Sequence, residues 1–102
     1  MDFHFLYHGQ RFVWNVEKAS ANVAKHGIRF EAACQVFLDP LLQMEDAGEA
    51  AGEAEPRVAA IGITEDRKLL YVVHVMRERE TIRIISARLA TAHERRFYED
   101  NQ

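Results

Sequence analysis

The sequence contains a single cysteine, Cys34, among 102 residues. One thiol excludes an intramolecular disulfide and any metal site that needs several thiolates. We expect Cys34 to be a small buried helix residue rather than a reactive thiol. The five histidines lie on different predicted elements without the spacing of a zinc motif, so a zinc site has little support. The sequence therefore predicts no metal site and no cofactor.

Long hydrophobic runs are also absent. No apolar segment approaches the roughly 20 residues that span a bilayer, and the N-terminus lacks the basic start of an export signal. We therefore expect a cytoplasmic protein with no membrane partner. Glycine-rich phosphate loops and the Gly-x-Ser-x-Gly elbow are missing too, which argues against nucleotide-dependent enzymes and serine hydrolases.

The net charge is −3, from 13 basic and 16 acidic residues, which by itself argues against a polyanionic partner. The acidic residues are unevenly distributed, because positions 45–55 hold five carboxylates and no basic residue. Without those five, 11 acidic residues remain against the 13 basic ones, so the rest of the chain carries a net charge of +2. The body of the protein is thus mildly basic.

The acidic segment is rich in Ala, Gly and Glu and has no large apolar residue between Asp46 and Pro56. A segment with nothing to bury does not join a core, so we expect a mobile acidic loop at about residues 45–56. A chain of 102 residues supports a single core. We therefore interpret residues 1–102 as a single domain that carries this loop as an insertion.

Turn and cap signals in the first part of the chain predict a hairpin and two helices. Gly9 supplies the turn between two strand-like runs. Asn15 is placed to cap the first helix, and Gly27 to end it in a left-handed conformation. The second helix should stop before Pro40, because proline disfavours a helical residue in front of it. The predicted elements are strands over residues 3–7 and 11–14 and helices over residues 16–25 and 30–37.

After the acidic segment, strand-like runs alternate with short charged turns, which favours an antiparallel meander. Thr91 and Glu94 form a capping-box pattern that starts a last helix, with Phe97 expected to anchor it. The predicted elements are strands over residues 57–63, 69–76 and 81–87 and a helix from 92 to about 99. The fold class is therefore α+β, with helices on an antiparallel sheet.

Motifs of a known family occur in order along most of the chain, from about Phe12 to Glu99. They are Trp14, Lys18, Asn22, Lys25-His26-Gly27, Phe30-Glu31-Ala32-Ala33, Val36-Phe37, Asp39-Pro40, Ile61-Gly62, Arg83-Ile84-Ile85-Ser86-Ala87-Arg88, Ala90, Glu94-Arg95 and Tyr98. In these residues the sequence closely resembles BrnT, the toxin of bacterial type II toxin–antitoxin systems.

The resemblance implies a RelE-like fold and an endoribonuclease that cleaves RNA without a metal and so inhibits translation. It also implies neutralisation by a ribbon-helix-helix antitoxin, BrnA, in a hetero-oligomer that touches DNA only through the antitoxin. Two positions depart from the family pattern. Asn15 stands where the family usually has an acidic residue, and Arg29 where it often has a small polar one. Neither change removes a cation.

Metal-independent RNA cleavage needs a base for the 2′-hydroxyl, cations for the phosphorane and an acid for the leaving 5′-oxygen. Lys25 and His26 are candidates for proton transfer, since imidazole has an ordinary pKa of about 6.5. The alternative is that both residues only complement the negative end of a helix dipole. Their sequence alone favours this alternative, and the resemblance makes the two interpretations equal.

Arg83 and Arg88 are candidates for the electrostatic role, because a guanidinium can grip a phosphate with two hydrogen bonds. A separation of five places them on opposite faces of a regular strand. They can share a site only if the strand ends near Ser86 or Ala87 and the chain bends. Otherwise one of them could form a structural ion pair with Glu94 or another carboxylate.

Four further residues are candidates for RNA binding. Arg77 and Arg79 lie in the turn before the last strand, where arginines are more often simply solvated. Trp14 and Tyr98 could stack on bases. Core packing is the stronger expectation for Trp14, whereas Tyr98 is expected on an exposed helix. A solvated helix face is the simplest interpretation of Lys18 and Asn22.

A second function remains open. The chain could instead be a non-catalytic module, either a degenerate toxin or a co-repressor, that binds an antitoxin and modulates its DNA binding.

Overall fold

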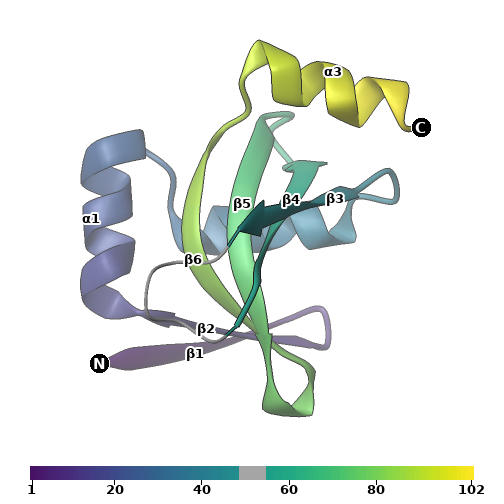
Figure 1. Ribbon diagram of the computed structural model, residues 1–102. Coiled ribbons are helices and arrows are strands. Elements are labelled where there is room, and N and C mark those ends of the chain that lie inside the picture. Colours follow the sequence, from purple (N-terminus) through teal and green to yellow (C-terminus); the bar gives the residue numbers. More distant parts are fainter. Residues whose placement is uncertain (49–54) are drawn as a thin grey trace.

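A computed structural model describes residues 1–48 and 55–102. Within these residues the chain forms a six-stranded sheet in the order β1-β2-β6-β5-β4-β3 (Figure 1). In sequence, helices both precede and follow the central strands. The strands are β1 (Asp2–Tyr7), β2 (Gln10–Asn15), β3 (Gln43–Gly48), β4 (Arg57–Ile63), β5 (Leu69–Arg77) and β6 (Thr81–Leu89). The helices are α1 (Val16–His26), α2 (Phe30–Ala33) and α3 (Ala92–Asp100), with 3₁₀ turns η1 (Cys34–Leu38) and η2 (Glu78–Glu80).

The expected α+β class and the meander of β4, β5 and β6 are confirmed. The sheet is mixed rather than purely antiparallel, because β2 pairs in parallel with β6 through Phe12 and Val13. A long crossover separates these two strands in sequence, and such a connection permits parallel pairing. The sequence did not predict this parallel pairing. The relative direction of two strands across a crossover depends on which edge of the sheet the later strand joins, and no local pattern encodes that edge.

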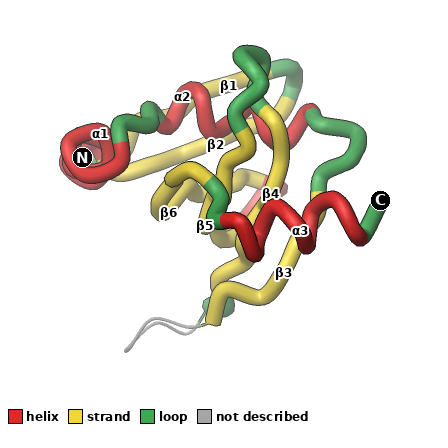
Figure 2. The backbone as a smooth tube through the Cα atoms, turned by 90° about the horizontal axis from the view of Figure 1, so that it is seen from above, coloured by secondary structure: helices red, strands yellow, loops and turns green. Residues whose placement is uncertain are grey.

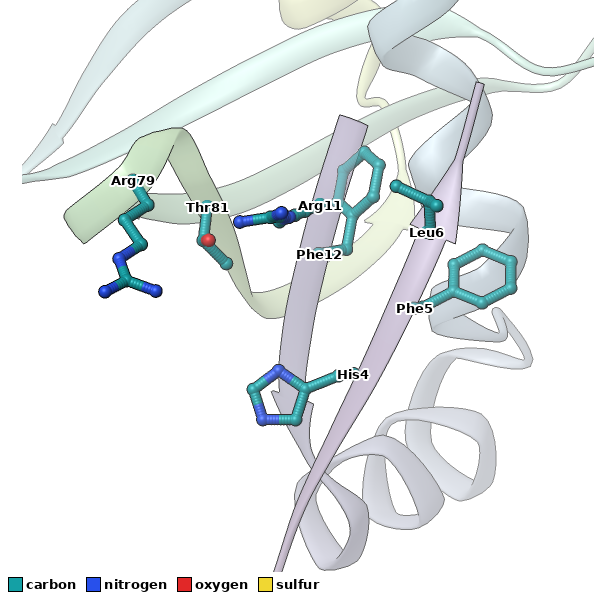
Figure 3. A pocket seen from close by; sticks show the side chains of 7 residues that line it. All are labelled: His4, Phe5, Leu6, Arg11, Phe12, Arg79 and Thr81. Atoms are coloured by element: carbon teal, nitrogen blue, oxygen red, sulfur yellow. The ribbon is translucent and has the colours of Figure 1, made fainter. Parts of the chain in front are cut away.

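The N-terminal hairpin pairs Phe3 with Trp14 and has its tight turn at His8 and Gly9, which both adopt positive φ. Two successive positive-φ residues are typical of the turn whose twist matches antiparallel strands. Alternation then separates the side chains. Phe5 points to one side of the hairpin, and His4 and Arg11 point to the other (Figure 3).

Strand β3 corrects the expectation of an acidic loop over residues 45–56. Glu45 and Asp46 lie in this strand, which pairs antiparallel with β4 and leaves Gln43 opposite Ile61. Pairing at a sheet edge depends on backbone groups, and charged side chains are common there. Residues 49–54 lie outside the described residues.

Both helix boundaries around α1 follow the sequence signals. The Asn15 side chain accepts a hydrogen bond from the Lys18 amide at 2.9 Å, and Gly27 ends the helix with φ +70°. The expected second helix is α2 continued as the 3₁₀ turn η1. Gly62 on β4 is required beneath η1, because a Cβ there would lie 2.9 Å from the carbonyl oxygen of Val36.

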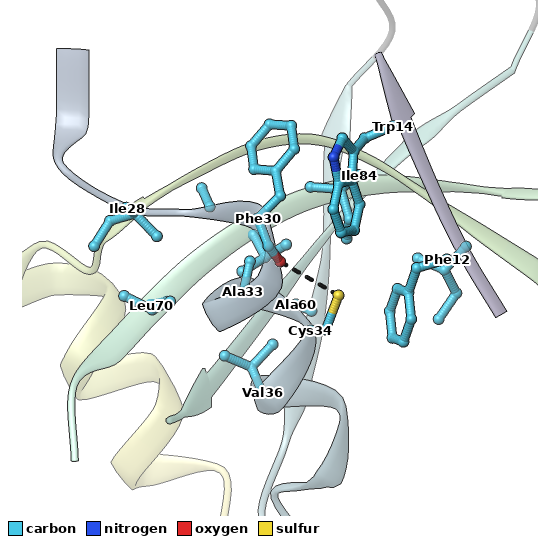
Figure 4. Close-up of a cluster of buried hydrophobic side chains, with 13 residues drawn as sticks. Phe12, Trp14, Ile28, Phe30, Ala33, Cys34, Val36, Ala60, Leu70 and Ile84 are labelled. Atoms are coloured by element: carbon cyan, nitrogen blue, oxygen red, sulfur yellow. Dashed lines mark hydrogen bonds between the residues drawn. The ribbon is translucent and has the colours of Figure 1, made fainter. Parts of the chain in front are cut away.

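The main core lies between α2, η1 and one face of the sheet (Figure 4). Trp14 from β2 packs edge-on against Phe30 from α2, with ring centroids 5.8 Å apart. Cys34 is buried in this cluster, as expected, and burial raises the pKa of its thiol to about 12. The thiol is therefore protonated and structural at neutral pH.

Helix α3 covers part of the opposite face, which we call the outer face. Figure 2 shows α2 and α3 on either side of the sheet. Tyr98 packs with Ile61 and Leu69, and its hydroxyl donates to the Asp39 carboxylate at 2.6 Å. The anchor of this helix is thus Tyr98 rather than Phe97, which is only partly buried.

A β-bulge interrupts β6. Val73 pairs with Ser86 and His74 pairs with Ile84, so Ile85 is the extra residue. An extra residue shifts the alternation of side chains by one position. Arg83 and Arg88 therefore point to the same outer face, although they are five residues apart. The expected end of the strand near Ser86 or Ala87 is wrong, because β6 continues to Leu89 and the bulge alone changes the alternation.

Asn22 joins α1 to the edge of β6. Its Nδ2 donates to the carbonyl oxygens of Ala87 at 2.8 Å and Ile28 at 2.9 Å, and its Oδ1 accepts from the Ala87 amide at 3.1 Å. The side chain is 7% exposed. The expectation of a solvated Asn22 is therefore wrong, because its amide replaces the strand partner that Ala87 lacks on this side.

We expect Asn22→Ala to lower the free energy of unfolding by about 2–4 kcal/mol, because it leaves buried backbone groups of Ala87 and Ile28 without a partner. Urea denaturation would measure the change. The control Ser20→Ala, on an exposed part of the same helix, should stay within about 0.5 kcal/mol of the parent. Equal stability of the two variants would contradict the bridging role of Asn22.

His74 should make stability depend on pH. Burial lowers the pKa of His74, and only a 3.5 Å contact with the Val72 carbonyl oxygen opposes that shift. The unfolded chain then takes up this proton first, so the contribution is complete above about pH 6.5 and is lost as the pH falls. We expect a loss of about 1 kcal/mol between pH 7.5 and 5.5.

Unfolding measured at both pH values would test this expectation. His74→Leu should remove most of the loss, whereas the control His93→Leu, at an exposed position, should keep it. An unchanged loss in His74→Leu would assign the pH dependence to other groups.

Candidate nucleic-acid interface

A cationic pocket of about 300 Å³ lies between α1, β4 and β6. Helix α1 contributes Lys25, which is exposed, and His26, which is half-buried. Arg57 reaches the same pocket from β4, and Ser86 from the bulged part of β6. Among the described residues its lining contains no carboxylate. The full lining is Lys18, Ala21, Asn22, Lys25, His26, Arg57, Ile85 and Ser86.

The local sequence positions these cations in two ways. Lys25 and His26 occupy the last turn of α1, where they complement the helix dipole. Asn22, one turn earlier, holds that end of the helix against Ala87. Helix-end placement and access to the pocket are therefore compatible, and the two interpretations of Lys25 and His26 do not exclude each other.

Arg83 lines a second pocket, of about 550 Å³, on the outer face of the sheet. Its guanidinium donates to the Asp2 carboxylate, and this hydrogen bond lowers the pKa of Asp2. Asp2 lies on the edge strand β1, and its side chain is 44% exposed, whereas that of Arg83 is 21% exposed. Solvent thus reaches the carboxylate side of the pair, where an ion pair contributes little and the carboxylate can be replaced by another anion.

Arg88 is held more firmly. It donates two hydrogen bonds to Glu94, at 2.8 and 2.9 Å, and its guanidinium carbon lies 4.2 Å from the centre of the Tyr71 ring. The hydrogen bonds with Glu94 raise the pKa of Arg88 and lower that of Glu94. Glu94 also forms the capping box with Thr91. Arg88 therefore ties β6 to α3, as the structural alternative stated.

Arg77 and Arg79 were both expected in the turn before the last strand, but Arg77 ends β5 and only Arg79 lies in the turn η2. Arg77 forms an ion pair with Glu55 and borders the 550 Å³ pocket beside Arg83. Arg79 borders a different pocket, formed with the β1–β2 hairpin. The outer face thus brings Arg77 and Arg83 together, and neither lines the pocket that holds Lys25 and His26.

The two aromatic residues proposed to stack on bases are buried. Trp14 is 3% exposed in the main core, which confirms the expectation that it packs in the core. Tyr98 is 6% exposed, which corrects its placement on an exposed helix face. Burial and the hydrogen bond to Asp39 raise the pKa of Tyr98 to about 12. Neither ring offers a free face to a base in this structure.

Sequence reasoning missed Arg57 as a member of the pocket and left Lys18 as a solvated residue. Their signal was weak, because Arg57 follows the acidic segment and Lys18 lies on a polar helix face. Only the pairing of β4 beside β5 and the docking of α1 bring the two residues to Ser86.

No group of three or more His, Cys, Asp or Glu side chains is arranged to hold a metal ion within residues 1–48 and 55–102. The helices of that part of the chain are also too short or too polar to cross a bilayer.

Comparison with known proteins identifies the family. A family model described as the ribonuclease toxin BrnT of type II toxin–antitoxin systems matches residues 14–94. That segment contains the cationic pocket, the bulge and the Arg88–Glu94 pair. A search of curated proteins finds no match. Because the family model covers most of the sequence, the chain belongs to the BrnT family of ribonuclease toxins of type II toxin–antitoxin systems.

Proposed function

We propose that this chain is an endoribonuclease that cuts cellular RNA without a metal, and that cleavage takes place in the cationic pocket. The observation that carries the proposal is the convergence of Lys18, Lys25, His26 and Arg57 around one hollow. Such a pocket favours a phosphodiester over other ligands, because the charge of the phosphate is matched from several sides.

The reaction would begin with attack of the ribose 2′-oxygen on the adjacent phosphorus. His26 takes the 2′-hydroxyl proton, and Lys25 gives a proton to the 5′-oxygen as the bond from phosphorus to that oxygen breaks. The products are a 2′,3′-cyclic phosphate and a free 5′-hydroxyl. Lys18 and Arg57 offset the additional negative charge on the phosphorane. Each role uses a side chain that lines the pocket.

Arg83 and Arg88 then serve different purposes. Arg83, with Arg77, binds the RNA backbone next to the pocket once the phosphate replaces Asp2 or Glu55. Arg88 is a positioning residue, because it holds β6 against α3 through Glu94. This assignment keeps Arg83 in contact with substrate and removes Arg88 from the chemistry.

The partner of the toxin follows from its family. A type II toxin acts with a protein antitoxin, and we propose that this antitoxin is a BrnA-like ribbon-helix-helix protein. Its dimerisation would make the complex a hetero-oligomer, and its DNA-binding domain would be the route by which the toxin influences transcription. A non-catalytic co-repressor remains the second candidate, because Arg77, Arg83 and Arg88 are all engaged by carboxylates.

Induced expression should arrest growth, and Lys25→Ala or His26→Ala should relieve the arrest and slow RNA cleavage at least about 100-fold, the usual minimum effect of general acid–base catalysis. Matched controls are Lys68→Ala and His93→Ala, which remove the same side chains from exposed positions away from the pocket. Cleavage by the purified protein, followed by gel electrophoresis, should persist in excess EDTA.

Three results would contradict parts of this proposal. Activity in both Lys25→Ala and His26→Ala would exclude the pocket as the reaction site. Loss of activity in EDTA would exclude the metal-independent mechanism. Absence of growth arrest and of RNA cleavage, with antitoxin binding intact, would favour the co-repressor function.

Asp2→Asn should release Arg83 for substrate. We expect KM for RNA to fall about two- to fivefold with kcat unchanged, because a surface ion pair of this kind is worth little and competes with phosphate. Arg83→Ala should raise KM instead. Steady-state kinetics of both variants would measure these shifts, with Asp66→Asn, at an exposed turn, as the control. A higher KM in Asp2→Asn would show that the ion pair supports the site rather than blocks it.

A further inference from the structure

A pocket of about 450 Å³ lies where the β1–β2 hairpin meets the turn between β5 and β6. Arg11 from β2 and Arg79 from the turn border it, together with His4 and Thr81 (Figure 3). Arg11, His4 and the Thr81 hydroxyl lie on the same side of the hairpin, opposite Phe5. Two guanidinium groups, an imidazole and a hydroxyl therefore border one hollow, and Phe5, Leu6 and Phe12 form the rest of its lining.

The two arginines differ from the other arginines of the outer face. Arg77, Arg83 and Arg88 each pair with a carboxylate. Within the described part of the chain, Arg11 and Arg79 form no ion pair or side-chain hydrogen bond, although Glu78 and Glu80 flank Arg79 in sequence. Their hydrogen-bonding groups are thus available to a ligand, and two guanidinium groups select an anion with several oxygens.

The backbone that carries the two arginines is fixed. Arg79 and Glu80 both have positive φ, a conformation that costs free energy for residues other than glycine. The Gln10 side chain fixes this turn, because its Nε2 donates to the Glu80 carbonyl oxygen at 2.7 Å and to the Arg11 carbonyl oxygen at 2.9 Å. One amide thus ties the backbone beside each arginine, so the two arginines leave the chain at fixed positions before a ligand binds.

This pocket continues the outer face toward the reaction site. It shares His4 and Thr81 with the 550 Å³ pocket that contains Arg77 and Arg83. Arg83 is two residues from Ile85 on β6, and Ile85 lines the cationic pocket. The three hollows therefore follow β6 in one direction, from the bulge to the hairpin. His4 and Arg11 lie before residue 14, outside the segment that matches the family model.

We propose that the hairpin pocket binds the phosphodiester backbone of single-stranded RNA, beyond the scissile phosphate, with Arg11 and Arg79 as the phosphate ligands. The inference rests on the proposed function for the identity of the substrate. Its location lets a strand that enters the cationic pocket continue along Arg83 to the hairpin. Cleavage chemistry does not require the hairpin site, but affinity for longer RNA does.

The test measures binding separately from cleavage. Fluorescence anisotropy would follow a labelled oligoribonucleotide whose 2′-hydroxyls are methylated, since it binds but cannot be cut. We expect Arg11→Gln/Arg79→Gln to weaken binding about tenfold and to reduce the slope of log K against log salt by about 1.4, or 0.7 for each lost phosphate contact. Arg95→Gln/Arg96→Gln, with the same charge change on exposed α3, is the control.

Each outcome has a distinct meaning. An equal loss of RNA affinity in the Arg11→Gln/Arg79→Gln variant and in the control would attribute the effect to net charge and overturn the proposal. Unchanged RNA affinity in that variant, or no RNA binding by the parent protein, would also overturn it. Loss of antitoxin binding, with RNA affinity unchanged, would assign the pocket to the protein partner and also overturn it. A selective loss of RNA binding in a protein that does not cleave RNA would support this site and refute the proposed catalysis.

Discussion

The hydrogen bonds between Asn22 and Ala87 determine where the cationic pocket can form. Strand β2 pairs with β6 at Ile82 and Arg83, and farther along the strand Asn22 supplies the missing partner for both backbone groups of Ala87. A primary amide can do this because it carries a donor and an acceptor in the geometry of a peptide group. The end of α1 is thereby held beside the bulge, and Lys25 and His26 reach the same hollow as Ser86.

The bulge at Ile85 is the second constraint, and it explains how arginines five residues apart share a face. Without the extra residue, the side chains of Arg83 and Arg88 would alternate to opposite faces. Their neighbours then separate their roles. Arg88 lies over Tyr71 and binds Glu94, whose side chain is 12% exposed, whereas Arg83 binds Asp2, whose side chain is 44% exposed, at the sheet edge. The same guanidinium group thus stabilises the fold at one position and remains exchangeable at the other.

Local signals predicted most elements because they depend on nearby residues. Asn15, Gly27 and the Thr91–Glu94 box mark helix ends through contacts within four residues, and the structure contains all three. Strand β3 was missed because its pairing uses backbone atoms and its sequence includes Glu45, Asp46 and Gly48 rather than β-branched or aromatic residues. Tyr98 was misplaced because its burial depends on packing with Ile61 and Leu69 and on a hydrogen bond to Asp39, which lies 59 residues away in sequence. Composition near either residue carries no trace of that contact.

The sequence by itself determined the α+β class, the meander, the buried thiol and the resemblance to BrnT, since each depends on residue order or on short-range periodicity. Tertiary structure decided which cations act together. Lys18, Lys25, His26 and Arg57 come from a helix and a strand separated by the acidic segment, and only sheet order and helix docking bring them together. The same is true of Arg11 and Arg79, because a charge cluster assembled across strands depends on long-range pairing that no local pattern encodes.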